Sequence, residues 1–185
     1  MAISVMTAGA IAVFTMQNVS ATGARRSRMI STATEVNRFW IERVKLEALR
    51  WGPVAYGHPS MTWLNTLPPA ETGSTGWFLP AARGTGDDLV TAASDWYGAP
   101  IPVPSGAGVP PAPYCTSLRL TWMSGGTDQV ARLDVRTWWH RPNRTADTIE
   151  GCGADQNALT TALTEVTDFG VIYGSTVIRW QGLPQ

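Results

Sequence analysis

Hydrophobic and polar residues are unevenly distributed along the first 51 residues of the chain. Residues 1–16 include no charged side chain, and the first ionisable side chains are those of Arg25 and Arg26. Residues 25–51 are rich in Arg, Glu and long apolar side chains, and the first proline follows at Pro53. This pattern predicts one helix over residues 1–51, about 75 Å long because each helical residue adds about 1.5 Å. We call residues 1–24 its front half and residues 25–51 its rear half.

The rear half has one apolar face when its residues are placed at intervals of about 100° around the helix. That face comprises Ile30, Ala33, Val36, Trp40, Ile41, Val44, Ala48 and Trp51. The charged side chains lie largely on the opposite face, and Glu47 is the exception within the apolar face. The rear half is therefore predicted to pack along one face on a globular body.

The front half has no polar face to turn towards water, so we expect it to lie in lipid or against other apolar helices. The residues expected in this membrane or fibre-core segment are Ile3, Val5, Met6, Ile11, Val13 and Phe14. A bilayer requires about 20 apolar residues, so this run is slightly short for a full span.

Two other interpretations of the front half stay open. A secretory signal peptide fits less well, because no basic segment precedes the apolar run and the helical pattern continues past any cleavage site. A plain membrane anchor would place Arg25, Arg26 and Arg28 at its cytoplasmic end.

Residues 52–113 form a loop region in which about a third of the positions are Gly or Pro. This density excludes long helices and most central strands. Aromatic residues are nevertheless scattered through the region, and we expect them to attach it to the body by burying their rings. The alternative is an exposed aromatic surface for a partner or a sugar, for which Trp63 and Trp96 are the candidates.

Alternation of apolar and polar residues predicts two strands, at residues 117–123 and 130–139, joined by a Gly-rich turn. The pattern favours an antiparallel hairpin with one solvent-exposed face. On the second strand that exposed face comprises Arg132, Asp134 and Arg136.

Residues 170–180 predict a further strand, whereas residues 156–167 fit either a short helix or another strand. The chain is thus predicted to have an α+β fold, with a long N-terminal helix packed on an antiparallel sheet of three or four strands. Residues 52–185 would form a globular head, in which residues 114–185 hold the sheet.

Cys115 and Cys152 flank the predicted hairpin, whose two ends lie close together. This arrangement favours a disulfide, which would contribute roughly 3–4 kcal/mol in the chain-entropy model. Two unrelated buried thiols are the alternative. A disulfide indicates an oxidising compartment, so we expect the head to be exported across the membrane.

The sequence offers little support for catalysis, a cofactor, a metal or nucleic acid. His58 and His140 are the only histidines, and neither has the spacing of a metal site. Asp87 and Asp88 follow a Gly-Thr-Gly turn that lacks the further residues of a phosphate loop. The net charge is zero, and no basic stripe lies outside the rear half. We therefore expect a structural protein and not an enzyme.

The N-terminal run from Met1 to Gly9, followed by an apolar stretch and a charged amphipathic continuation, resembles the N-terminal helix of type IV pilins and pseudopilins. The strand start Tyr114-Cys115, the strand Ala131–Arg141 and the later Gly151-Cys152-Gly153 are similar to the PilV-like minor pilins. In that family a leader and a Phe-Thr-Leu-Ile-Glu-like start precede this stretch. Neither is found here, so we expect the chain to begin inside the mature helix.

The resemblance implies a minor pilin that acts in priming pilus assembly or at the pilus tip. Its partners would be other minor and major pilins, bound through the N-terminal helix, and a tip adhesin. It would lie in the inner membrane with a periplasmic head before assembly and in the extracellular pilus afterwards, with a methylated N-terminus. The alternatives are a minor pseudopilin of a type II secretion system and a membrane-anchored module that binds carbohydrate or another partner.

Overall fold

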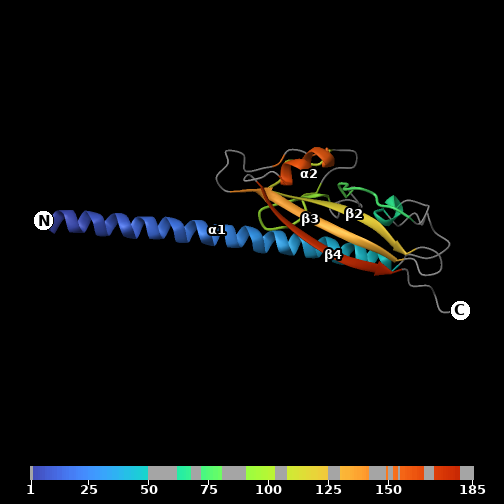
Figure 1. The fold of residues 1–185 in the computed structure, drawn as a ribbon, viewed down its shortest axis with the longest axis horizontal. Coiled ribbons are helices and arrows are strands. Elements are labelled where there is room, and N and C mark those ends of the chain that lie inside the picture. Colours follow the sequence, from blue (N-terminus) through green and yellow to red (C-terminus); the bar gives the residue numbers. More distant parts are fainter. Residues whose placement is uncertain are drawn as a thin grey trace.

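The computed structural model describes residues 2–49, 62–67, 72–80, 91–102, 108–124, 130–141, 149, 152–153, 155–164 and 169–179. In this part of the chain a long helix, α1 (Ala2–Ala48), packs its rear half on a four-stranded antiparallel sheet. The front half extends away from the sheet (Figure 1). The fold is therefore α+β, as the sequence predicts.

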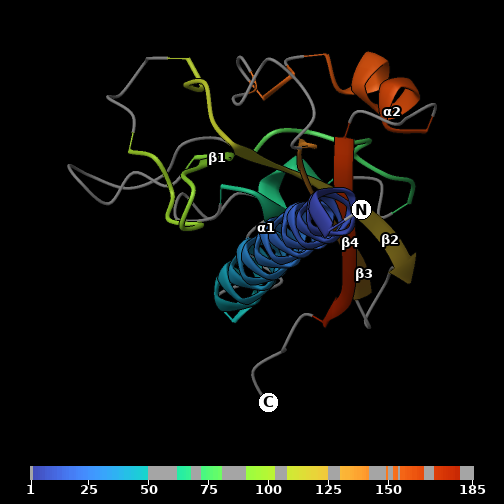
Figure 2. The ribbon, with the colours of Figure 1, turned by 90° about the vertical axis from the view of Figure 1, so that its left-hand side faces the viewer.

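The sheet has the order β1-β2-β3-β4, and all neighbouring strands are antiparallel. Its strands are β1 (Ala93–Ser94), β2 (Tyr114–Ser124), β3 (Val130–His140) and β4 (Phe169–Arg179). A view along α1 shows the helix lying against β4 and β3 (Figure 2). A second helix, α2 (Gln156–Thr164), lies on the opposite side of the sheet (Figure 1).

The segment for which helix and strand were both open is helical over Gln156–Thr164. Asp155 precedes it, and its Oδ1 accepts hydrogen bonds from the backbone N–H groups of Asn157 and Ala158 at 2.9 and 3.1 Å. This is an N-cap, which satisfies donors that the first turn of a helix leaves unpaired. Of the described residues within 52–113, only Leu64–Thr66, a 3₁₀ helix (η1), and β1 are regular elements.

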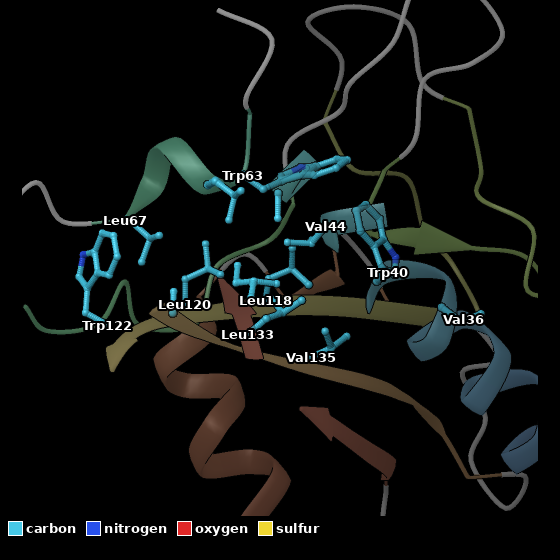
Figure 3. Close-up of a cluster of buried hydrophobic side chains, with 14 residues drawn as sticks. Val36, Trp40, Val44, Trp63, Leu67, Leu118, Leu120, Trp122, Leu133 and Val135 are labelled. Carbon is cyan, nitrogen blue, oxygen red and sulfur yellow. The ribbon is translucent and has the colours of Figure 1, made fainter. Parts of the chain in front are cut away.

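The main hydrophobic core lies between the rear half of α1 and the sheet (Figure 3). Five residues of the predicted apolar face are buried there or beside it, namely Ala33, Val36, Trp40, Val44 and Ala48. From the sheet, the core takes Leu118, Leu120, Trp122, Ala131, Leu133, Val135 and Ile178.

The predicted apolar face was wrong at Ile30, which is 43% exposed. Ile30 lies at the margin of the stripe, close to where α1 leaves the sheet, so no strand covers it. Met29 is buried in its place, and Ile41 is half-buried. Trp51 lies outside the described residues.

Asn37 is a buried polar residue on the same face of α1, and its position depends on a glycine of β4. Its Nδ2 donates a hydrogen bond to the carbonyl oxygen of Val135 at 3.2 Å. A Cβ on Gly174 would lie 2.2 Å from Asn37 Oδ1, closer than any real contact. The missing side chain of Gly174 therefore lets α1 approach the sheet closely enough for Asn37 to reach it.

The sheet face opposite α1 is less exposed than the hairpin pattern predicts, because Asp134 and Arg136 are buried. Arg136 donates to Ser117 Oγ at 2.7 Å, to Thr160 Oγ1 at 2.8 Å and to the Gln156 side chain at 3.1 Å. Its guanidinium also lies 4.4 Å from the Trp77 ring centroid. Burial lowers the pKa of Arg136 to about 10, so it remains charged near neutral pH. Trp77 and α2 cover a strip that alternation alone assigned to solvent.

Candidate functional site

The front half of α1 carries several large apolar side chains that other parts of the described chain do not cover. Every described side chain between residues 9 and 28 is exposed. The predicted residues Met6, Ile11, Val13 and Phe14 are 80%, 62%, 56% and 68% exposed. The side chains of Ile3 and Val5 lie outside the described part. Exposed apolar surface on this scale marks an interaction site.

Gln17, Asn18 and Ser20 are polar and exposed in the front half, whereas two threonines bond to the helix itself. Thr15 Oγ1 donates a hydrogen bond to the carbonyl oxygen of Ile11 at 2.7 Å, and Thr22 Oγ1 donates to that of Asn18 at 2.8 Å. These hydroxyls are satisfied by the helix itself. Within the described residues, no helix is both long enough and apolar enough to cross a membrane.

Arg25, Arg26 and Arg28 are exposed at the start of the rear half, where α1 meets the head. None of the three forms an ion pair with another described residue. The first acidic residue of the chain is Glu35, so no carboxylate precedes or separates them in the sequence. A hollow of about 670 Å³ opens beside them, lined by Arg25, Arg28, Met29, Thr32, Trp96, Tyr97 and Tyr114.

A tight turn after β1 places two aromatic side chains at the rim of this hollow. Asp95 Oδ1 accepts hydrogen bonds from the N–H groups of Tyr97 and Ala99 at 2.8 and 2.9 Å. Gly98 has φ +84°, and a Cβ added there would lie 3.1 Å from the Thr32 and Val36 side chains of α1. The turn therefore packs closely on the helix. On this turn the side chains of Trp96 and Tyr97 are 44% and 92% exposed.

Tyr114 forms the floor of the hollow and joins β2 to α1. Its side chain is 1% exposed. Burial raises the pKa of Tyr114, and the nearby Thr32 side chain lowers it in part. The Trp96 ring stands edge-on to Tyr114, with centroids 6.4 Å apart. Trp96 thus packs on the buried Tyr114 and is partly exposed to solvent.

The alternative of an exposed Trp63 was wrong, and this residue instead buries its ring as expected of the aromatics in the loop region. Trp63 is 2% exposed, and its ring packs edge-on against Trp40, with centroids 5.4 Å apart (Figure 3). Glu47 explains the position, because its carboxylate accepts hydrogen bonds from the backbone N–H groups of Thr62 and Trp63. The acidic exception within the apolar face of α1 therefore attaches the η1 segment, and Trp63 completes the core.

The predicted disulfide is confirmed, since Cys115 and Cys152 are joined with Cα atoms 5.4 Å apart. It is buried in a second cluster on the side of the sheet away from α1, with Trp138, Ile149 and Leu159. The bond ties the start of β2 to the segment before α2.

The described residues contain no group of three or more metal-binding side chains. His140 stacks on Phe169, with ring centroids 4.6 Å apart. His58, Asp87 and Asp88 lie outside the described residues. A smaller polar hollow of about 400 Å³ on the far face of the sheet is lined by Trp77, Arg119, Arg132, Asp134, Tyr173, Gly174 and Ser175.

Sequence reasoning singled out Trp96 and the arginines but did not bring them together. It missed Tyr97, although Asp95 followed three residues later by Gly98 is typical of a tight turn with its central residues outermost. No sequence pattern indicated that the turn after β1 contacts α1, because this contact depends on how the head packs on the helix.

Comparison with protein-family models, with curated proteins and with solved structures finds no match for this chain.

Proposed function

We propose that this protein is a minor pilin of a type IV pilus, of the PilV-like kind. The observation that carries the proposal is the front half of α1, an apolar helical extension whose described side chains are exposed from residue 9 onwards. The extension continues without interruption into a helix that packs on the head. Water disfavours such a surface, so the front half requires lipid or other apolar helices.

In the proposed cycle the inner membrane holds the front half first, with the head in the periplasm. Transfer into the fibre then replaces lipid by the corresponding helices of other minor and major pilins. The Cys115–Cys152 disulfide supports an oxidising compartment for the head. The protein would prime assembly or lie at the pilus tip beside an adhesin.

The test is complementation of a deletion strain, with surface pili counted by electron microscopy. Deletion is expected to reduce piliation, and the wild-type chain to restore it. Val13→Asp should fail to restore it, since a charged residue in an apolar helical environment costs about 2.5–3.5 kcal/mol. Val177→Asp is the matched control, because Val13 and Val177 are 56% and 55% exposed and Val177 lies on β4. Full piliation and twitching in the deletion strain would refute the priming role.

A minor pseudopilin of a type II secretion system would use the same surface. Proteins that co-purify with the full chain would separate the two, as pilus or as secretion components. The exposed Trp96 favours a membrane-anchored carbohydrate-binding module as the candidate from another class. Glycan binding that is lost on Trp96→Ala, with piliation unchanged, would support that function instead.

A further inference from the structure

We propose that Arg25, Arg26 and Arg28, together with Trp96 and Tyr97, form a collar that binds the headgroups of anionic phospholipids. The collar would hold the head at the membrane surface while the front half lies in lipid. This inference rests on the proposed membrane-held stage of the protein.

The charge of the collar calls for an anionic partner. Its three guanidinium groups are exposed and form no ion pair within the described residues. The acidic side chain nearest in sequence to the aromatic pair, Asp95, is already engaged by two backbone N–H groups of its own turn. Guanidinium groups bind phosphate through several parallel N–H donors, which suits a phospholipid headgroup.

The aromatic members of the collar have the properties of residues at a membrane surface. Trp and Tyr concentrate at the boundary between hydrocarbon and water, because each has an apolar ring and a polar group. Trp96 and Tyr97 are presented on a turn held by Asp95 and seated against Thr32 and Val36 through Gly98. Little conformational freedom is therefore lost when they enter the headgroup layer.

The collar lies at the boundary between the exposed part of α1 and the part that packs on the head. The described side chains of residues 9–28 are exposed, and Met29 is the first buried one. When the front half lies in lipid, the arginines are therefore next to the head, and their long side chains can extend into the headgroup layer.

The shape of the site favours a lipid surface over a free anion. The hollow is open, and Tyr97 at its rim is 92% exposed. Tyr114, the buried tyrosine of its lining, is 1% exposed and presents little surface to a small ligand.

The experiment measures binding of the full chain to vesicles of phosphatidylcholine alone and of phosphatidylcholine with phosphatidylglycerol. We expect tighter binding to the anionic vesicles, weakening with added salt. Arg25→Gln and Arg28→Gln should each weaken that binding about 5-fold, and leave binding to the neutral vesicles unchanged. Trp96→Ala should weaken binding to both kinds of vesicle, because the ring enters the interface whatever the charge.

Arg38→Gln is the matched control, since it removes the same charge from an exposed position within the rear half. Its binding to both vesicles should equal that of the wild type, and the unfolding midpoint of every variant should confirm that the head is folded. An equal loss on Arg38→Gln would show that only total charge matters, and would overturn the proposal.

Three further results would also overturn it. Equal binding to neutral and anionic vesicles, with Arg25→Gln and Arg28→Gln unaffected, would refute headgroup binding by the collar but not the proposed membrane-held stage. Binding to neither kind of vesicle would refute both. Displacement from anionic vesicles by inorganic phosphate, beyond that caused by chloride at the same ionic strength, would identify a free-phosphate site.

Discussion

Glu47 interrupts the apolar face of α1 because its partners come from a different part of the chain. Its carboxylate accepts hydrogen bonds from the backbone of Thr62 and Trp63, and the side chain is 5% exposed. A buried carboxylate without such donors would be strongly unfavourable. Glu47 and Asn37 are therefore polar contacts through which α1 holds the η1 segment and the sheet.

Trp63 and Trp96 should differ in their effect on stability. Trp63→Ala removes a ring from the main core and is expected to lower the free energy of unfolding by about 3–5 kcal/mol. Trp96→Ala should cost about 1 kcal/mol or less, because the ring is 44% exposed. Urea denaturation of both variants measures the difference. Equal losses would contradict the burial of Trp63.

At the scale of elements, the packing of β4 against α1 and against the Trp139 ring of β3 depends on two glycines that have no side chain. A Cβ on Gly170 would lie 2.3 Å from the Trp139 ring, and one on Gly174 would lie 2.2 Å from Asn37 Oδ1. Both glycines belong to β4. A glycine normally weakens a strand, because it loses more conformational freedom on folding and has no side chain to pack. Here close packing with the helix and with the Trp139 ring offsets that loss.

Gly174→Ala should therefore destabilise the head, although alanine is a small residue. The added methyl group forces Asn37 and α1 away from the sheet, and overpacking of this kind costs about 1–3 kcal/mol. Ser175→Ala is the control, since Ser175 is the next residue of β4 and is exposed, and its effect should stay within about 0.5 kcal/mol. Thermal unfolding followed by near-UV circular dichroism compares the two. A Gly174→Ala variant as stable as the control would show that α1 is free to move.

At the scale of the whole molecule, α1 has two separate tasks. The main and adjoining cores take residues from Met29 onwards, whereas the described side chains of residues 9–28 are exposed. The front half therefore contributes little to the stability of the head, and the described buried residues of α1 all belong to its rear half.

Removal of residues 1–24 is expected to leave a folded head. Its unfolding midpoint should stay within about 4 °C of that of the full chain, equivalent to roughly 1–2 kcal/mol for a domain of this size. The truncated protein should also lose association with neutral vesicles, because the apolar extension is gone, and should keep only the weaker binding of the collar to anionic vesicles. Differential scanning calorimetry and vesicle co-sedimentation measure the two effects. A larger fall in the midpoint would indicate that the front half stabilises the head.

The local pattern by itself determined the long helix, the hairpin and the further strand, and it left α2 open between helix and strand. The long helix, the β2–β3 hairpin and the further strand each have a periodic pattern of apolar and polar residues. This pattern follows from local backbone geometry and does not depend on which segment packs against the element. The spacing of Cys115 and Cys152 likewise anticipated their disulfide, because both cysteines flank a hairpin whose ends must meet. The role of the front half stays a prediction from the same kind of pattern.

Only the tertiary structure decided which faces are covered and which side chains meet. Arg136 was assigned to solvent and Trp63 was a candidate for exposure, yet both are buried, because segments distant in the sequence lie over them. The same holds for the collar, in which α1 and the turn after β1 contribute residues some 70 positions apart. The periodicity of a helix or strand indicates only which face of that element a residue occupies. Contacts between remote segments depend on how those elements are stacked, and no local pattern carries that information.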